Sequence, residues 1–149
     1  MLILDTQLLV LLVVGLTSPA IIAKHKNLTA FDESDYRLLR SMLGPNPSII
    51  LLPNIVTEAS SLLRQHKNPE KARIMMVFRD VIAAWEERYV ASALAASHSD
   101  FVRLGVTDCA ILTGGAPRLL TADFDLFRAA RTQGLSVINF NHHREQFGL

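Results

Sequence analysis

Five carboxylates stand where predicted helices and strands begin or end, each beside apolar residues: Asp5, Glu58, Asp108, Asp123 and Asp125. Asp5 directly follows the apolar residues Ile3 and Leu4, and Asp123 and Asp125 share one strand-to-helix turn. A charge in such a position must be paired, solvated or bound to a metal ion. The residue types and their positions therefore point to a shared acidic site.

Several carboxylates in one cleft would repel one another and raise their pKa values, and a divalent cation would relieve that repulsion. Oxygen ligands with no cysteine or histidine pair beside them favour magnesium or manganese over zinc. Such an ion polarises a phosphodiester, orients or deprotonates a water molecule and stabilises the leaving oxygen. Hydrolysis of nucleic acid is the chemistry that this pattern indicates.

Each acid also has an ordinary structural role available. Asp5 could pair with a basic side chain, and Glu58 could lie on a helix surface. Asp108 could complement a helix dipole in a first turn, and Asp123 could cap a helix. Taken singly, these roles are the commoner ones for such residues. Taken together, the five positions favour a common site.

The elements that would position these acids alternate along the chain. The sequence predicts strands over residues 2–4, 48–52, 118–121 and 135–140. Helices are predicted over about 7–16, 33–43 with Asp32 or Ser34 as cap, 55–63, 69–82, 85–96, 108–113 with Thr107 as cap, and 124–131. Strands alternating with helices predict an α/β fold with a parallel sheet covered on both faces. Ligands of such sheets bind at the carboxyl ends of the strands, where sequence-distant acids can meet.

Composition sets broad limits on the fold and its partners. A chain of 149 residues, half of them hydrophobic, suits one domain with a sizeable core. A formal charge of +1 indicates no overall basic field for nucleic acid, so any such contact must come from a local patch. The only cysteine is Cys109, which excludes an intrachain disulfide framework and favours a reducing, cytoplasmic location.

Residues 6–23 carry no charge, a length at which a membrane span must be considered. Polar and helix-breaking residues interrupt the stretch, and no basic residue precedes it as a signal peptide would require. We expect buried structure and no membrane insertion. The stretch is also more apolar than a small sheet can easily hide, which predicts a homodimer or a tight complex with an inhibitor through the early helices.

Four segments together resemble the PIN domain ribonucleases, a family that includes the toxins of many prokaryotic toxin-antitoxin pairs. They are Ile3-Leu4-Asp5-Thr6, Pro53-Asn54-Ile55-Val56-Thr57-Glu58, Gly105-Val106-Thr107-Asp108-Cys109-Ala110-Ile111 and Leu120-Thr121-Ala122-Asp123-Phe124-Asp125. Each segment alone is a weak signal, whereas their order and spacing are fairly specific. The resemblance covers nearly the whole chain.

The resemblance implies a single PIN-like domain over residues 1–149, with three α/β/α layers and a short parallel sheet of four to five strands. It implies that Asp5, Glu58, Asp108 and Asp123 form a catalytic quartet that binds Mg²⁺ or Mn²⁺, with Asp125 as a less constant fifth metal ligand. Thr6 and Thr121 match hydroxyl positions beside that site. The implied activity is metal-dependent endoribonuclease cleavage of RNA, in a toxin that pairs with itself and is held by an antitoxin.

Two alternatives come from other functional classes. A non-catalytic PIN-like module could keep the fold and the acids while serving binding or assembly. A phosphatase of the haloacid dehalogenase type also begins with an aspartate at a strand end, but it requires a second aspartate two residues later. That position is Gln7 here, which argues against the phosphatase.

Overall fold

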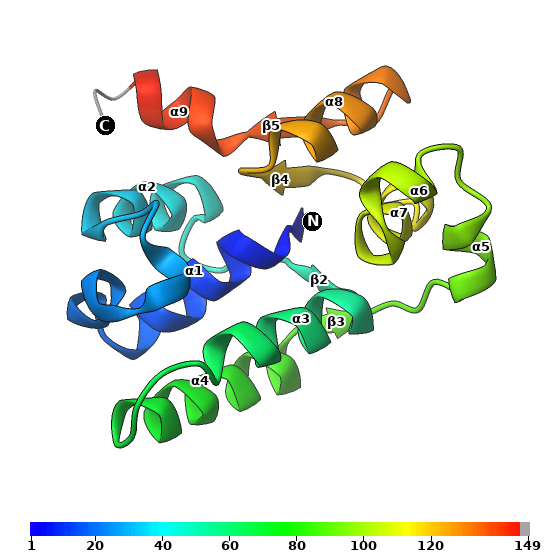
Figure 1. The fold of residues 1–149 in the computed structure, drawn as a ribbon. Coiled ribbons are helices and arrows are strands. Elements are labelled where there is room, and N and C mark those ends of the chain that lie inside the picture. Colours follow the sequence, from blue (N-terminus) through cyan, green and yellow to red (C-terminus); the bar gives the residue numbers. More distant parts are fainter. Residues whose placement is uncertain (147–149) are drawn as a thin grey trace.

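The computed structural model describes residues 1–146 and has an α/β fold with parallel strands (Figure 1). Three strands form one sheet in the order β1-β4-β5, and two more form the pair β2-β3. Their bounds are β1 Ile3–Leu4, β2 Ile50–Leu51, β3 Glu86–Glu87, β4 Leu119–Thr121 and β5 Val137–Asn139. Every strand pairing within the described residues is parallel, as predicted.

A short parallel bridge places β2 on the free side of β1. Leu2 pairs with Ile49 there, and the Ile50 amide donates to the Leu2 carbonyl over 2.8 Å. The amides of Ile3 and Asp5 point the opposite way. The Ile3 amide donates to a carbonyl directly before β4, and the Asp5 amide donates to a carbonyl within β4. Because alternate residues of a strand face opposite neighbours, the five strands lie in the spatial order β3-β2-β1-β4-β5.

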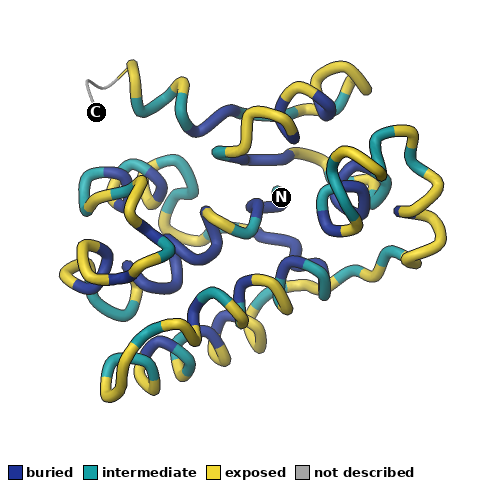
Figure 2. Tube along the Cα trace, in the orientation of Figure 1, coloured by how far each residue is buried: buried dark blue, intermediate teal, exposed yellow. Residues whose placement is uncertain are grey.

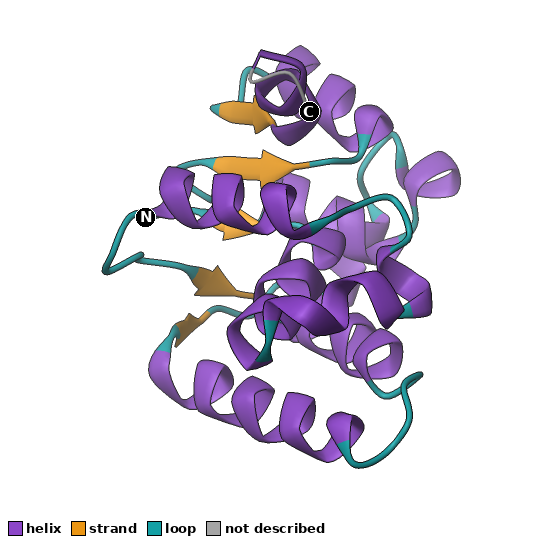
Figure 3. Ribbon diagram, turned by 90° about the vertical axis from the view of Figure 1, so that its left-hand side faces the viewer, coloured by secondary structure: helices purple, strands orange, loops and turns teal. Residues whose placement is uncertain are grey.

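Helices make up most of the chain and pack beside this small set of strands (Figure 3). In the view of Figure 1, α1 and α2 lie on one side of the strands and α5 to α7 on the other, which is compatible with three α/β/α layers. The helices are α1 Thr6–Thr17, α2 Glu33–Leu43, α3 Pro53–Leu63, α4 Glu70–Ala84, α5 Ser92–Ala96, α6 Phe101–Leu104, α7 Val106–Thr113, α8 Phe124–Thr132 and α9 Phe140–Gln146. Two 3₁₀ segments, η1 Pro19–Lys24 and η2 Lys26–Leu28, connect α1 to α2.

Helix α1 forms the centre of the hydrophobic core. Its residues 8–15 are all buried, on every side of the helix, and it packs against α2, α3, α4 and η1 (Figure 2). A helix that is apolar all round is expected to lie inside a protein. Across the described residues, no helix has both the length and the apolar character needed to cross a bilayer. One chain therefore buries residues 8–15 of the uncharged stretch by itself, and these residues supply no reason to expect a dimer.

The helix predicted over residues 85–96 is wrong. Trp85 ends α4 in an extended conformation, Glu86 and Glu87 form the edge strand β3, and only Ser92–Ala96 are helical. The Arg88 amide donates to the Leu51 carbonyl over 2.9 Å, which continues the pairing with β2. Backbone pairing with β2 therefore outweighs the helix propensity of this segment.

Two further differences concern local boundaries. Gly105, with φ of +87°, is the N-cap of α7, so Thr107 does not cap this helix and its hydroxyl is used elsewhere. The last predicted strand is shorter than expected, because the chain turns into α9 at Phe140. Helix α9 was not predicted from the sequence.

Gly15 lets α1 and α2 approach closely. A Cβ atom at this position would overlap the ring of Tyr36, whose side chain is buried and whose hydroxyl accepts a hydrogen bond from Arg40. We predict that Gly15→Ala destabilises the fold by about 1–3 kcal/mol, because overpacking outweighs a helix-propensity gain of about 1 kcal/mol. Urea unfolding measures this, with Leu16→Ala on the exposed side of the same helix as control. A Gly15→Ala variant as stable as the wild type would show that the helices separate without cost.

Candidate functional site

The four acids of the predicted quartet line one cleft of about 690 Å³. Asp5 follows β1 and Asp123 follows β4, and these strands lie side by side with Leu4 opposite Leu120. Glu58 comes from α3, which follows β2, and Asp108 comes from the first turn of α7. The cleft thus lies at the carboxyl ends of the central strands, where parallel α/β sheets place their ligands.

Asp5 is buried and uses both of its carboxylate oxygens. Oδ1 accepts a hydrogen bond from the Leu8 amide over 3.0 Å and caps α1. Oδ2 accepts from the Ala122 amide over 2.9 Å and from the Thr121 hydroxyl. Burial raises the pKa of the Asp5 carboxyl, while these hydrogen bonds oppose that rise. The predicted supporting residue Thr121 therefore contacts the site directly.

Two threonine hydroxyls hold Glu58 from different helices. Thr6 Oγ1 donates to Glu58 Oε1 over 3.0 Å, and Thr107 Oγ1 donates to Oε2 over 2.7 Å. The supporting role predicted for Thr6 is thus matched by a contact in the structure. Thr107 was missed as a site residue because its place before Asp108 suggested a helix cap.

The carboxyl of Asp108 is affected by the charges of four other acids. Burial, followed by the negative charges of the other acids, raises the pKa of its carboxyl to about 7. Among the described residues, no hydrogen bond to this carboxylate is formed by a side chain or amide. The Asp108 carboxyl therefore holds its proton more tightly than a free aspartate does, and a nearby cation would favour its ionised form.

Asp123 and Asp125 differ in position. Asp123 lines the cleft and caps α8 by accepting a 3.0 Å hydrogen bond from the Leu126 amide, and its own amide donates to Thr121 Oγ1 over 2.9 Å. The Asp125 side chain is 70% exposed, does not line the cleft, and lies 4.0 Å from Arg103. Its charge is the weakest of the four that raise the pKa of Asp108. The structure brings together four of the five predicted acids.

The donor set fits a hard divalent cation, since the cleft combines carboxylate oxygens with a pKa elevated by like charges. Asp108, with Asp5, Glu58 or Asp123, would hold such an ion. Across residues 1–146, however, no three side chains of Asp, Glu, His or Cys form a compact, ready set of ligands.

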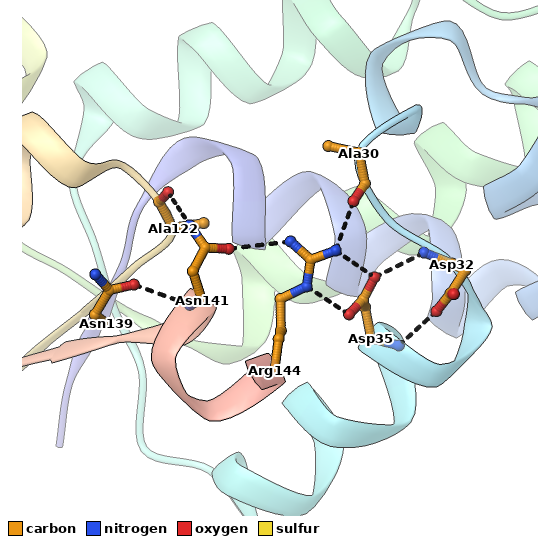
Figure 4. A network of polar contacts seen from close by, with 7 residues as sticks. All are labelled: Ala30, Asp32, Asp35, Ala122, Asn139, Asn141 and Arg144. Atoms are coloured by element: carbon orange, nitrogen blue, oxygen red, sulfur yellow. Dashed lines mark hydrogen bonds and ion pairs between the residues drawn. The ribbon is translucent and has the colours of Figure 1, made fainter. Parts of the chain in front are cut away.

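A polar network connects α9 to the acidic turn (Figure 4). The Arg144 guanidinium binds both carboxylate oxygens of buried Asp35, over 2.7 and 3.1 Å, and donates to the Ala30 carbonyl over 2.8 Å. It also donates to Asn141 Oδ1, and Asn141 Nδ2 donates to the Ala122 carbonyl over 2.9 Å. Ala122 is the residue whose amide holds Asp5. Helix α9 therefore supports the turn that positions Asp5.

Sequence reasoning missed Asn141 and Arg144 although both line the cleft. The polar residues directly after the last predicted strand were a possible signal for Asn141, since side chains at strand ends face ligands. No local pattern marks Arg144, because its partner Asp35 is 109 residues away in the sequence.

We predict that Asp108→Asn stabilises the fold at alkaline pH. The unfolded carboxyl ionises near 3.8 and the folded one near 7, so the folded state binds more protons between these values and wild-type stability falls as pH rises through them. In chelator at about pH 8, the variant should gain about 1–2 kcal/mol, less than full linkage gives because solvent screens the cleft. Toward pH 4 the gain should disappear.

Urea unfolding across this pH range provides the measurement, with exposed Asp80→Asn on α4 as the matched control. Equal wild-type and Asp108→Asn stabilities at alkaline pH would contradict the raised pKa of the Asp108 carboxyl.

We predict that Arg144→Met lowers the free energy of unfolding by at least about 2 kcal/mol, because it leaves the buried Asp35 carboxylate without its cation. The control Arg37→Met removes an exposed pair with Glu33 and should cost less than about 0.5 kcal/mol. Adding Asp35→Asn to Arg144→Met should restore part of the loss. Equal effects of the two arginine substitutions would mean that the Arg144 pair has no special importance.

Comparison with models of protein families, with curated proteins and with solved structures found no match to this chain.

Proposed function

We propose that this chain is a metal-dependent endoribonuclease of the PIN-domain type. The observation that carries the proposal is the meeting of four carboxylates from four distant segments, Asp5, Glu58, Asp108 and Asp123, in one open cleft. Such convergence is electrostatically costly, and burial together with the charges of the other acids raises the pKa of Asp108. A cation at the cleft and a polyanionic substrate would account for the arrangement.

A bound Mg²⁺ or Mn²⁺ would polarise the phosphodiester and orient a water molecule for in-line attack. The residues of the chain prepare the cleft for that chemistry. Thr6 and Thr107 fix the Glu58 carboxylate, while Thr121 and the Ala122 amide fix Asp5. Because these acids cannot rotate freely, little reorganisation is needed when a cation and a phosphate enter.

The resemblance to PIN-domain toxins supports further parts of this proposal. A cognate antitoxin would bind the chain and inhibit RNA cleavage in the cytoplasm, and two copies of the chain would pair. The core buries residues 8–15 of α1, so most apolar surface for such contacts must come from elsewhere. Met76 and Ile82 on α4 are 56% and 37% exposed and supply some of it.

One observation favours the alternative of a non-catalytic binding or assembly module. Within the described part of the chain, the acids share a cleft without forming a compact set of three ligands. A module that had kept the acids but not the activity would bind manganese weakly or not at all and would leave RNA intact.

We predict that the wild type cleaves RNA in Mg²⁺ or Mn²⁺ and that chelator abolishes the cleavage. Asp108→Asn should reduce the rate of cleavage by about 100-fold or more, because it removes transition-state stabilisation. Asp125→Asn is the matched control, because Asp125 lies outside the cleft and its removal should change the rate by less than about threefold. Gel analysis of labelled RNA measures the rates.

Manganese titration by calorimetry, performed on the same proteins, separates the two candidate functions. Binding that is lost in Asp5→Asn, together with RNA cleavage, supports the nuclease. Manganese binding with no cleavage of a broad RNA panel would favour the module, and cleavage that persists in chelator would exclude the proposed role of the acids.

A further inference from the structure

A second hollow, of about 500 Å³, lies on the outer side of α8 next to the acidic cleft. We call it the aromatic-arginine groove, and it is lined by Phe124, Phe127, Arg128, Arg131, Thr132 and His142. Phe124, Phe127, Arg128 and Arg131 recur at intervals of three and four, which places them on one face of α8. Helix α9 contributes His142, whose ring meets Phe127 edge-on at 5.7 Å.

The two arginines stand over the two aromatic rings. The guanidinium carbon of Arg128 lies 5.8 Å from the centre of the Phe124 ring, and that of Arg131 lies 6.0 Å from the Phe127 ring. Phe124 is 58% exposed, whereas Phe127 is mostly covered. The groove therefore offers one accessible aromatic surface and two cations held close to it.

Arg128 and Arg131 differ from those surface arginines whose charge is balanced by an ion pair. Arg37, Arg79, Arg88 and Arg103 each lie within 4.0 Å of a carboxylate. Among residues 1–146, Arg128 and Arg131 have no carboxylate within that distance, and no Asp or Glu lines the groove. In a chain with a formal charge of only +1, two unpaired cations beside an exposed ring form a local anion-binding surface.

Consecutive residues at the start of α8 line the acidic cleft and the groove. Asp123 lines the cleft, and the next residue, Phe124, lines the groove. On α9, Asn141 lines the cleft and the next residue, His142, lines the groove. A chain molecule leaving the cleft across the first turn of α8 would pass directly onto Phe124 and then reach Arg128 and Arg131.

We propose that the aromatic-arginine groove binds the single-stranded RNA that flanks the cleavage position, with a base stacked on Phe124 and phosphates held by Arg128 and Arg131. This inference rests on the proposed nuclease function and assigns it a substrate class. Stacking on an aromatic side chain requires an unpaired base, which a single strand supplies and a duplex does not. Guanidinium groups bind phosphate oxygens through two parallel hydrogen bonds.

Fluorescence anisotropy with a labelled short oligouridylate, in chelator so that no cleavage occurs, tests the groove. Phe124→Ala should weaken binding about fivefold or more, as loss of one stacked base does. Arg128→Gln with Arg131→Gln should weaken it and lower the salt slope of log K by about 1 to 2, since each contact on a single strand contributes about 0.7. A blunt duplex of the same length should bind more weakly than the single strand.

Matched controls come from other exposed positions. Tyr89→Ala removes an aromatic side chain that is 79% exposed, and Arg79→Gln removes a cation on α4. Both should bind like the wild type. Groove variants that bind as tightly as these controls would overturn the inference, as would wild-type protein that prefers the duplex or fails to bind the single strand.

The outcome is separable from that of the nuclease proposal. Groove-dependent RNA binding without metal-dependent cleavage would support the groove and exclude the enzyme. Cleavage that depends on Asp108, with a KM unchanged in the groove variants, would support the enzyme and exclude the groove.

Discussion

The buried carboxylate of Asp5 joins parts of the chain that are far apart in sequence. One oxygen caps α1, the helix at the centre of the core, and the other holds the turn after β4, more than 110 residues away. The same turn begins α8 and carries Asp123 into the cleft. Core, sheet and acidic site thus depend on one side chain, and any substitution there affects all three.

The surrounding residues show how a fold tolerates clustered negative charge. Hydroxyl and amide donors satisfy Asp5 and Glu58, so their orientation is set without a neutralising cation. Arginine is used at the other wall of the cleft, where Arg144 is occupied by Asp35. The positive charge of Arg144 is therefore already balanced by Asp35, and the cleft remains electronegative.

Much of this arrangement could be predicted because parallel strands end on the same side of a sheet. That rule places Asp5 and Asp123 together, and helical periodicity places Glu58 within the first two turns of the helix that follows β2. The rule does not reveal Thr107 or Arg144, whose roles depend on contacts 49 and 109 residues away in sequence. Nor does it reveal β3, because Glu86 and Glu87 are exposed and join the sheet through backbone bonds alone.

The span of the Asp5 and Arg144 contacts has a consequence during protein synthesis. Strand β1 and the Asp5 carboxylate leave the ribosome early, but β4, the turn at Thr121 and the support from Arg144 emerge more than a hundred residues later. Until then, α1 lacks part of its packing. The Asp5 carboxylate that caps α1 also lacks its contacts with the turn after β4. During that interval, nascent α1 exposes apolar surface of the kind that promotes aggregation. The turn that positions Asp5 gains its support from α9 only after residue 144 has been made.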